Sequence, residues 1–142
     1  MNYAEISKET ISLLYKTHAS LKDSPLDPVI KVLAELRTSQ INGCAYCCRV
    51  HTNEAKVLKV STEKIDDLQH WKDSKAYTEA ELAALLWTEK LTEVKDFDQE
   101  ALVEIRKQLT AYFSERELVD LTICISMMNA LNRIAISLKD DN

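Results

Sequence analysis

The ten residues from Asn42 to His51 hold the side chains best suited to chemistry in this chain. They read Asn-Gly-Cys-Ala-Tyr-Cys-Cys-Arg-Val-His, so Cys44 and Cys47 form a Cys-x-x-Cys pair and His51 follows four residues later. In a helix, steps of three and four residues place side chains on one face. Two thiols within reach of a disulfide bond, with an imidazole beside one of them, are the components of a redox site.

The same stretch offers a role for each reactive side chain. A thiol must lose its proton before it attacks a peroxide or a disulfide, and the N-terminus of a helix favours the thiolate. His51 can take the proton from Cys47, and the sulfenic acid that a peroxide leaves on Cys47 can condense with Cys44. Gly43, the only glycine of the chain, suits a tight turn into that helix.

Two alternatives remain open for this cluster. The first is a zinc site, whose ligands would be Cys44, Cys47 or Cys48, and His51. Structural zinc is usually held by two separated pairs of ligands, and Cys124 stands alone in an apolar segment, where a small buried hydrophobe is the simpler interpretation. We therefore expect no metal and no organic cofactor. The second alternative is a cysteine cluster without chemistry, and Cys48 either faces the core or competes for the disulfide.

Composition limits the possible partners and location. The 142 residues are 46% apolar and 29% charged, as in an ordinary globular domain. The net charge is −5 and no basic stripe is present, so we expect no nucleic-acid partner. No apolar run approaches the roughly 20 residues of a membrane span, and the first residues do not resemble a signal peptide. We therefore expect no membrane association and a cytoplasmic location, where a close cysteine pair is more often redox-active or metal-binding than structural.

The chain has few residues that break helices. One glycine and two prolines are present, without period-2 alternation or a hairpin signal, so the sequence predicts an all-α fold. We expect a single domain over residues 1–142 with about six or seven helices. Capping patterns indicate helix starts at Asp27, Ser61, Thr78, Asp98 and Ser114.

Two of these helices carry specific expectations. The first is predicted over about residues 3–21, and the side chains that should face inward are Ile6, Leu13, Leu14 and Leu21. The last, over residues 118–138, is apolar on more than one side. It is therefore predicted to be the central helix or part of a subunit interface.

The segment from Glu35 to Ala55, with its pattern Ser-x-x-Asn-x-Cys-x-x-Cys-x-x-x-His, resembles the core motif of the carboxymuconolactone decarboxylase family. More narrowly, it is similar to the alkylhydroperoxidase D-like (AhpD-like) branch of that family. Residues 81–92, and residues 118–121 with 129–133, are similar to later blocks of the same branch, so the resemblance covers most of the chain from Pro28 to Leu138.

The resemblance implies a helical fold, assembly into trimers or hexamers, and peroxidase or disulfide-reductase chemistry. Its substrate would be a hydroperoxide and its partner a thiol or disulfide reductant protein. By the same resemblance Cys47 attacks the peroxide, Cys44 resolves the product, and His51 is the family histidine. The alternatives are a redox sensor or assembly protein that only toggles its disulfide, and a decarboxylase that acts on a lactone acid.

The chain departs from the family pattern at two positions. The proton-relay glutamate of the family lies twelve residues before the first cysteine, where this chain has Val32. The acids that could replace it are Glu35, Glu81 and Glu89. In addition, Lys59 stands where a glycine commonly ends the cysteine helix.

Overall fold

Helix-forming residues with few breakers give a chain that is built of helices. The computed structural model describes residues 1–94 and 98–138, and all regular structure in these ranges is helical. The α-helices are α1 (Tyr3–Ile6), α2 (Lys8–Ser20), α3 (Pro28–Asn42), α4 (Ala45–Val57), α5 (Thr62–Asp66), α6 (Glu79–Thr92), α7 (Gln99–Leu109) and α8 (Glu115–Leu138). Two short 3-10 helices, η1 (Leu21–Asp23) and η2 (Asp67–Asp73), lie between them. The expected all-α fold is confirmed, with α1 and α5 as single turns beside the longer helices.

Capping side chains set the helix starts where the sequence places them. The Asp27 carboxylate accepts a hydrogen bond from the backbone N–H of Val29 at 2.8 Å, and Pro28 occupies the first position of α3. This geometry satisfies a backbone donor that the helix itself leaves unpaired. The other expected caps also bond to the backbone of the following first turn, and these are Ser61, Thr78, Asp98 and Ser114.

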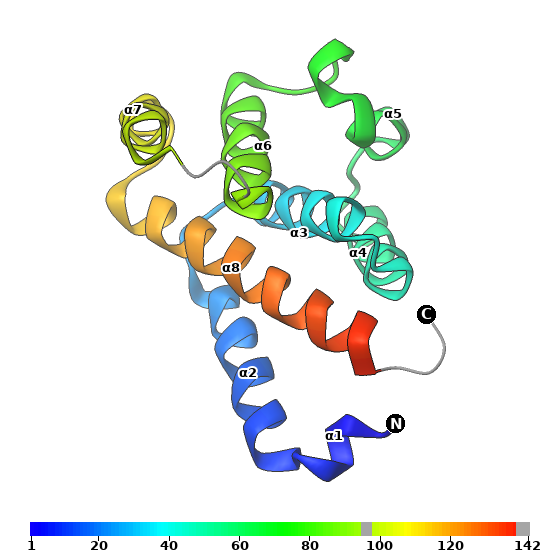
Figure 1. Ribbon diagram of the computed structural model, residues 1–142. Coiled ribbons are helices and arrows are strands. Elements are labelled where there is room, and N and C mark those ends of the chain that lie inside the picture. The colour runs from blue at the N-terminus through cyan, green and yellow to red at the C-terminus, as the bar shows by residue number, and fades with distance from the viewer. Residues whose placement is uncertain (95–97, 139–142) are drawn as a thin grey trace.

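Helix α3 lies at the centre of the arrangement, packed against α4, α6 and α8 (Figure 1). Its buried residues contribute to two apolar clusters. One joins α3 to α6, α7 and α8 around Ala34, Trp87 and Ile125, and the other joins α3 to α6 and η2 around Leu33, Leu68 and Leu85. Because α3 is buried on several sides, a polar side chain on it is removed from water, which matters for the site described below.

The N-terminal segment differs from the expected single helix. It divides at Ser7 into α1 and α2, and none of the residues of either helix is buried. Of the residues expected to face inward, Leu21 is buried and Leu14 is half-buried, whereas Ile6 and Leu13 are 73% and 56% exposed. The periodic pattern of apolar residues is present, but α2 extends away from the core, with α8 beside it and one polar contact from His18 to α3 (Figure 1).

Helix α8 runs through the core, as predicted for the last apolar segment. By length and composition alone it could cross a membrane. Its buried face, however, includes Asp120, Asn129 and Asn132, which hydrogen-bond to side chains of other segments. A core helix passes the same test of length and hydropathy, so α8 is only weak support for a membrane span.

Candidate active site

The turn between α3 and α4 presents the first cysteine. Gly43 ends α3 with a φ of 70°, in the left-handed region that glycine adopts without strain. The backbone N–H of Cys44 then bonds to the Ser39 carbonyl at 3.0 Å, which closes the helix end. Cys44 itself caps α4, because its sulfur accepts a bond from the backbone N–H of Cys47 at 3.4 Å.

The two cysteines of the motif are bonded to each other. Cys44 and Cys47 form a disulfide with their Cα atoms 5.3 Å apart. Cys44 is fully buried, whereas Cys47 keeps 8% of its surface exposed, and both pack against Ala135 of α8. The bond therefore lies at the N-terminus of α4, where backbone N–H groups favour a thiolate after reduction.

Asparagine side chains fix the turn to α8. The Asn42 amide donates to the side-chain oxygens of Asn129 and Asn132, at 3.0 Å each. Asn132 in turn donates to the Ser39 hydroxyl at 3.2 Å. These polar residues of α8 are therefore structural, and they hold the residues before Cys44 in place.

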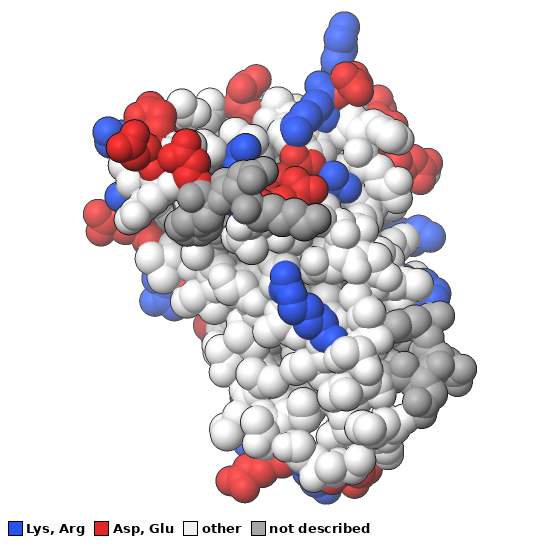
Figure 2. Space-filling view, in the orientation of Figure 1, with Lys and Arg blue, Asp and Glu red and all other residues white. Residues whose placement is uncertain are grey.

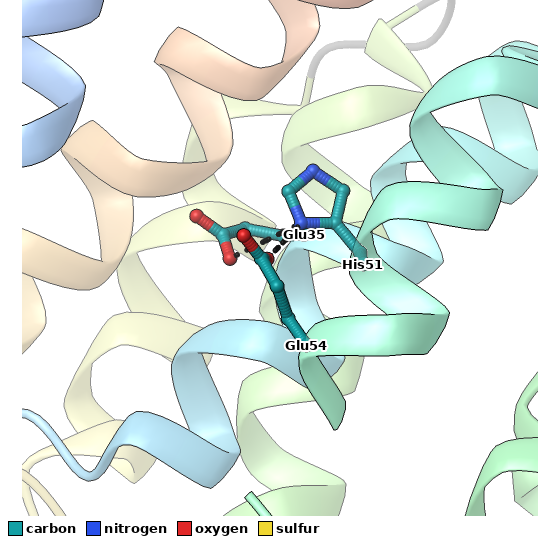
Figure 3. Close-up of side chains that lie close together, drawn as sticks. All are labelled: Glu35, His51 and Glu54. Carbon is teal, nitrogen blue, oxygen red and sulfur yellow. Dashed lines mark hydrogen bonds and ion pairs between the residues drawn. The ribbon is translucent and has the colours of Figure 1, made fainter. Parts of the chain in front are cut away.

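His51 lies one helical turn after Cys47, and its ring faces two carboxylates (Figure 3). Its Nδ1 is 2.7 Å from Oε2 of Glu54 and 3.6 Å from Oε2 of Glu35, while the other ring nitrogen points away from both. His51 is buried, with 5% of its surface exposed. The structure thus places two carboxylates at one nitrogen of the imidazole, on the helix that carries Cys47.

Glu35 is a fully buried carboxylate whose two oxygens have different surroundings. Oε1 accepts hydrogen bonds from Nε2 of His18 at 2.5 Å and from the Lys31 ammonium at 2.7 Å. Oε2 is buried without a hydrogen-bond partner and faces His51. Burial alone would raise the pKa of Glu35, but the bond from His18 and the charge of Lys31 outweigh it and lower this pKa to about 2. Glu35 is therefore ionised at neutral pH.

The three glutamates that could replace the missing relay acid have different surroundings in the structure. Glu81 closes the capping box of α6 and accepts a hydrogen bond from Lys64 at 2.7 Å. Glu89 accepts bonds from Arg37, Lys72 and Trp71, so it serves a structural network. Of the three, Glu35 faces His51. It lies one turn after Val32, and Val32 is buried.

The remaining cysteines lie apart from the disulfide. Cys48 is half-buried and packs against the apolar cluster of α3, α6 and η2, where burial raises the pKa of its thiol. Cys124 of α8 is buried and donates its S–H to Oε1 of Glu35 at 3.6 Å, and burial raises its pKa well above the usual value. Cys48 is therefore a core-facing residue, whereas Cys124 is more than the small hydrophobe that its apolar neighbours suggest.

A cavity of about 660 Å³ reaches this cluster from the surface. Its walls come from α2, η1, α3 and α4 and are largely apolar, with Leu21, Val32 and Leu58 among the residues that line it. Glu35 and Glu54 also line it, but the cysteine pair does not. Solvent can therefore approach Glu54 through this cavity, whereas Glu35 keeps almost no exposed surface.

A metal ion is a further possibility for the same cluster. Within the described ranges, the side chains that could surround an ion are Glu35, His51 and Glu54, whose ligand atoms lie within 4.8 Å of one another. No cysteine belongs to this group, so the zinc ligands considered from the sequence are not assembled. The Lys31 ammonium already pairs with the Glu35 carboxylate, so no metal ion is needed to balance the charge of that carboxylate.

Sequence reasoning missed three members of the cluster. His18 belongs to no sequence motif, yet it is half-buried because the turn after α2 brings it against α3, and no local pattern signals that contact. Lys31 and Glu54 could have been found, because they lie four residues before Glu35 and three residues after His51 on their helices.

Comparisons with known proteins agree with this fold and motif. Residues 9–90, more than half of the chain, match the Carboxymuconolactone decarboxylase family. The uncharacterized protein YdfG of Bacillus subtilis (strain 168) is 28% identical over 97% of this chain and 92% of its own length. YnjA of Escherichia coli (strain K12), also uncharacterized, is 29% identical over 76% of this chain and 58% of its own length.

Two solved structures have similar folds. ATU0492 of Agrobacterium tumefaciens, a protein of unknown function provisionally named as the antioxidant defence protein AhpD, is 32% identical, with a TM-score of 0.91 over 100% of this chain and 96% of its own. An uncharacterized peroxidase-related protein from Silicibacter sp. TM1040 is 19% identical, with a TM-score of 0.78 over 91% of this chain and 68% of its own, and this likeness concerns the fold alone. The chain therefore belongs to the carboxymuconolactone decarboxylase family and has an AhpD-like fold.

Proposed function

We propose that this protein is a thiol-dependent peroxidase that reduces hydroperoxides with Cys44 and Cys47. The observation that carries the proposal is the disulfide at the N-terminus of α4, with His51 one turn later on the same helix and two carboxylates behind its ring. The similarity to ATU0492, which is provisionally named AhpD, supports the same class of chemistry.

The oxidative half-reaction begins at the more exposed cysteine. The Cys47 thiolate attacks the hydroperoxide, so that a sulfur–oxygen bond forms, the oxygen–oxygen bond breaks and an alkoxide leaves. The alkoxide takes a proton from His51, which had received it from Cys47. Cys44 then attacks the Cys47 sulfenic acid, the disulfide forms and water leaves. A thiol reductant restores both cysteines by thiol–disulfide exchange.

Glu35 supplies the negative charge near His51 that the missing relay acid would otherwise supply. Its carboxylate is ionised and buried, and its Oε2 faces Nδ1 of His51 at 3.6 Å. An imidazolium formed by proton transfer from Cys47 is stabilised by this negative charge, because the surrounding protein screens it less than water would. Glu35 therefore favours the thiolate form of Cys47.

The proposal is tested by hydroperoxide consumption with dithiothreitol as the reductant. The wild type should consume the peroxide catalytically, and Cys47→Ser should abolish both turnover and sulfenic acid formation. Cys44→Ser should instead accumulate the sulfenic acid, which a dimedone-type probe traps and mass spectrometry locates on Cys47. Cys48→Ser is the matched control, because that thiol packs against the core, and it should retain wild-type turnover.

Each alternative gives a different result in this assay. A sensor that only toggles its disulfide would form the Cys44–Cys47 bond once and show no sustained peroxide consumption. A reversal of roles would appear as sulfenic acid trapped on Cys44 in Cys47→Ser. A decarboxylase would show neither peroxide consumption nor dependence on Cys44.

A further inference from the structure

The two carboxylates behind His51 differ in access to water, although they face the same ring nitrogen (Figure 3). The Glu35 side chain is 1% exposed, whereas the Glu54 side chain is 51% exposed. Glu54 is also the closer partner, at 2.7 Å from Nδ1 against 3.6 Å for Glu35. Only the shorter of these distances is a hydrogen bond through which a proton can transfer directly.

Glu35 is occupied by other partners. Its Oε1 accepts bonds from His18 of α2 and Lys31 of α3, and Cys124 of α8 donates to the same atom. Protonation of this carboxylate would discard its pairing with the Lys31 ammonium inside the protein, which is costly. Glu35 is therefore suited to remain an anion throughout the reaction rather than to carry a proton.

We propose that Glu54 is the group through which His51 exchanges protons with solvent, while Glu35 remains a fixed anion. This inference rests on the proposed thiol chemistry of Cys44 and Cys47. Glu54 bonds to His51 and is a positioning and proton-exchange residue that acts through that imidazole. The cavity of about 660 Å³ that Glu54 lines supplies the water that takes or returns the proton.

The proton balance of the two half-reactions shows in which of them Glu54 is needed. In oxidation, the two thiol protons of Cys44 and Cys47 end on the alcohol and the water, so His51 needs none from solvent. In reduction, two reductant thiolates (2 RS⁻) attack in turn and leave as RS–SR, and the buried disulfide becomes two thiols. That step consumes two protons from solvent, and Cys44 is fully buried. Glu54 is therefore needed for reduction and is dispensable for oxidation.

The test measures the two half-reactions separately in the purified full-length protein. Reduced protein is mixed with hydrogen peroxide, and oxidised protein with dithiothreitol, and thiol content is followed in time. Glu54→Gln keeps an acceptor for the Nδ1–H of His51 but cannot carry the proton. It should slow reduction about tenfold or more, in the range of general acid–base effects, and change oxidation by less than about twofold.

Two further variants make the result specific. Glu54→Ala should also reduce slowly, and added imidazole buffer should restore its rate in proportion to buffer concentration, because a small acid can replace the missing carboxylate. Glu104→Gln is the matched control, since Glu104 is a similarly exposed glutamate three residues from a lysine on α7. It should behave as wild type with or without imidazole.

The inference is overturned if Glu54→Gln slows both half-reactions equally, if it leaves reduction unchanged, or if imidazole does not rescue Glu54→Ala. These outcomes are distinct from failure of the proposed function. Absence of peroxide turnover in the wild type would remove the peroxidase proposal, yet reduction of the existing disulfide could still be measured and would still test Glu54.

Discussion

At the scale of single residues, the defining feature is a charged carboxylate in the core, Glu35, which faces His51 of the cysteine helix. Both oxygens of the Glu35 carboxylate lie near groups that offset the cost of burying its charge. His18 and Lys31 donate to Oε1, and Oε2 faces His51. Removing one partner of this buried carboxylate is expected to lower the stability of the fold by more than the whole cluster contributes, because the remaining charge would be left buried and unpaired.

The depressed pKa of Glu35 makes the stability of the fold depend on pH. The pKa falls from 4.5, the ordinary value expected in the unfolded chain, to about 2 in the folded protein. The resulting stabilisation, about 3 kcal/mol, is fully present above the unfolded value and is lost as pH falls from about 4.5 to about 2. Urea unfolding at pH 5, 4 and 3 should show this loss in the wild type and a weaker dependence in Glu35→Gln. A slope in Glu35→Gln as steep as that of the wild type would contradict it, and Glu104→Gln should match the wild type.

The members of the site differed in how readily the sequence revealed them. Cys44, Cys47 and His51 were recognised because one helix brings them together, and helical spacing can be read directly from the chain. Glu35 was one of three candidates, since its selection over Glu81 and Glu89 depends on how α3 packs against α4. His18 could not be found, because its contact depends on the path of the chain between α2 and α3.

At the scale of the elements, the turns at the two ends of the cysteine helix are built differently. Gly43 precedes α4 in the left-handed region at no steric cost, and a Cβ added there would meet no atom within 4 Å. Lys59 follows α4 with a φ of 59°, the only described non-glycine residue with positive φ, and carries the strain that glycine would avoid. The departure from the family pattern at Lys59 is thus a local conformational cost.

Exchanging the residues at these turns should move stability in opposite directions. Lys59→Gly should stabilise the protein by about 1 kcal/mol, and Gly43→Ala should destabilise it by about the same amount, because only the backbone strain changes. Urea unfolding at pH 7 measures both. Lys59→Ala is the control and should be near neutral, since it keeps a Cβ. A destabilised Lys59→Gly would show that the lysine side chain, not the backbone, determines the turn.

Most helices were predictable because capping residues mark where they begin, and residues that break helices mark where they end. The exception was the first helix, where apolar spacing at Ile6 and Leu13 predicted burial that the folded chain does not provide. Periodicity shows that a face is apolar, but it does not identify what covers that face.

At the scale of the whole molecule, apolar surface remains on the helices farthest from the core. Leu13 and Tyr15 of α2 and Val119 and Ile123 of α8 are exposed. The face over α8 and α2 bears few acidic or basic side chains, which gather toward other parts of the view (Figure 2). An apolar surface of this kind is a common site of subunit contact.

We therefore expect a homo-oligomer, and the family resemblance favours a trimer or hexamer. Sedimentation at micromolar concentration should give a mass that is a multiple of three times 16.2 kDa. Leu13→Lys should shift the distribution toward smaller species if α2 lies in the interface, whereas Lys107→Ala on α7 should leave it unchanged. A single species of 16.2 kDa at all concentrations would contradict the expectation.

The absence of buried residues in α2 has a consequence for the access of water to Glu35. Local opening of a segment costs little free energy when few apolar contacts hold it, so the amides of α2 should exchange with deuterium much faster than those of α3. Each opening withdraws His18 from Glu35 and admits water to a carboxylate that is otherwise sealed. Subunit association over α2 would suppress these openings, so deuterium exchange of residues 8–20 should slow as protein concentration rises. The access of water to Glu35 should fall over the same range of protein concentration.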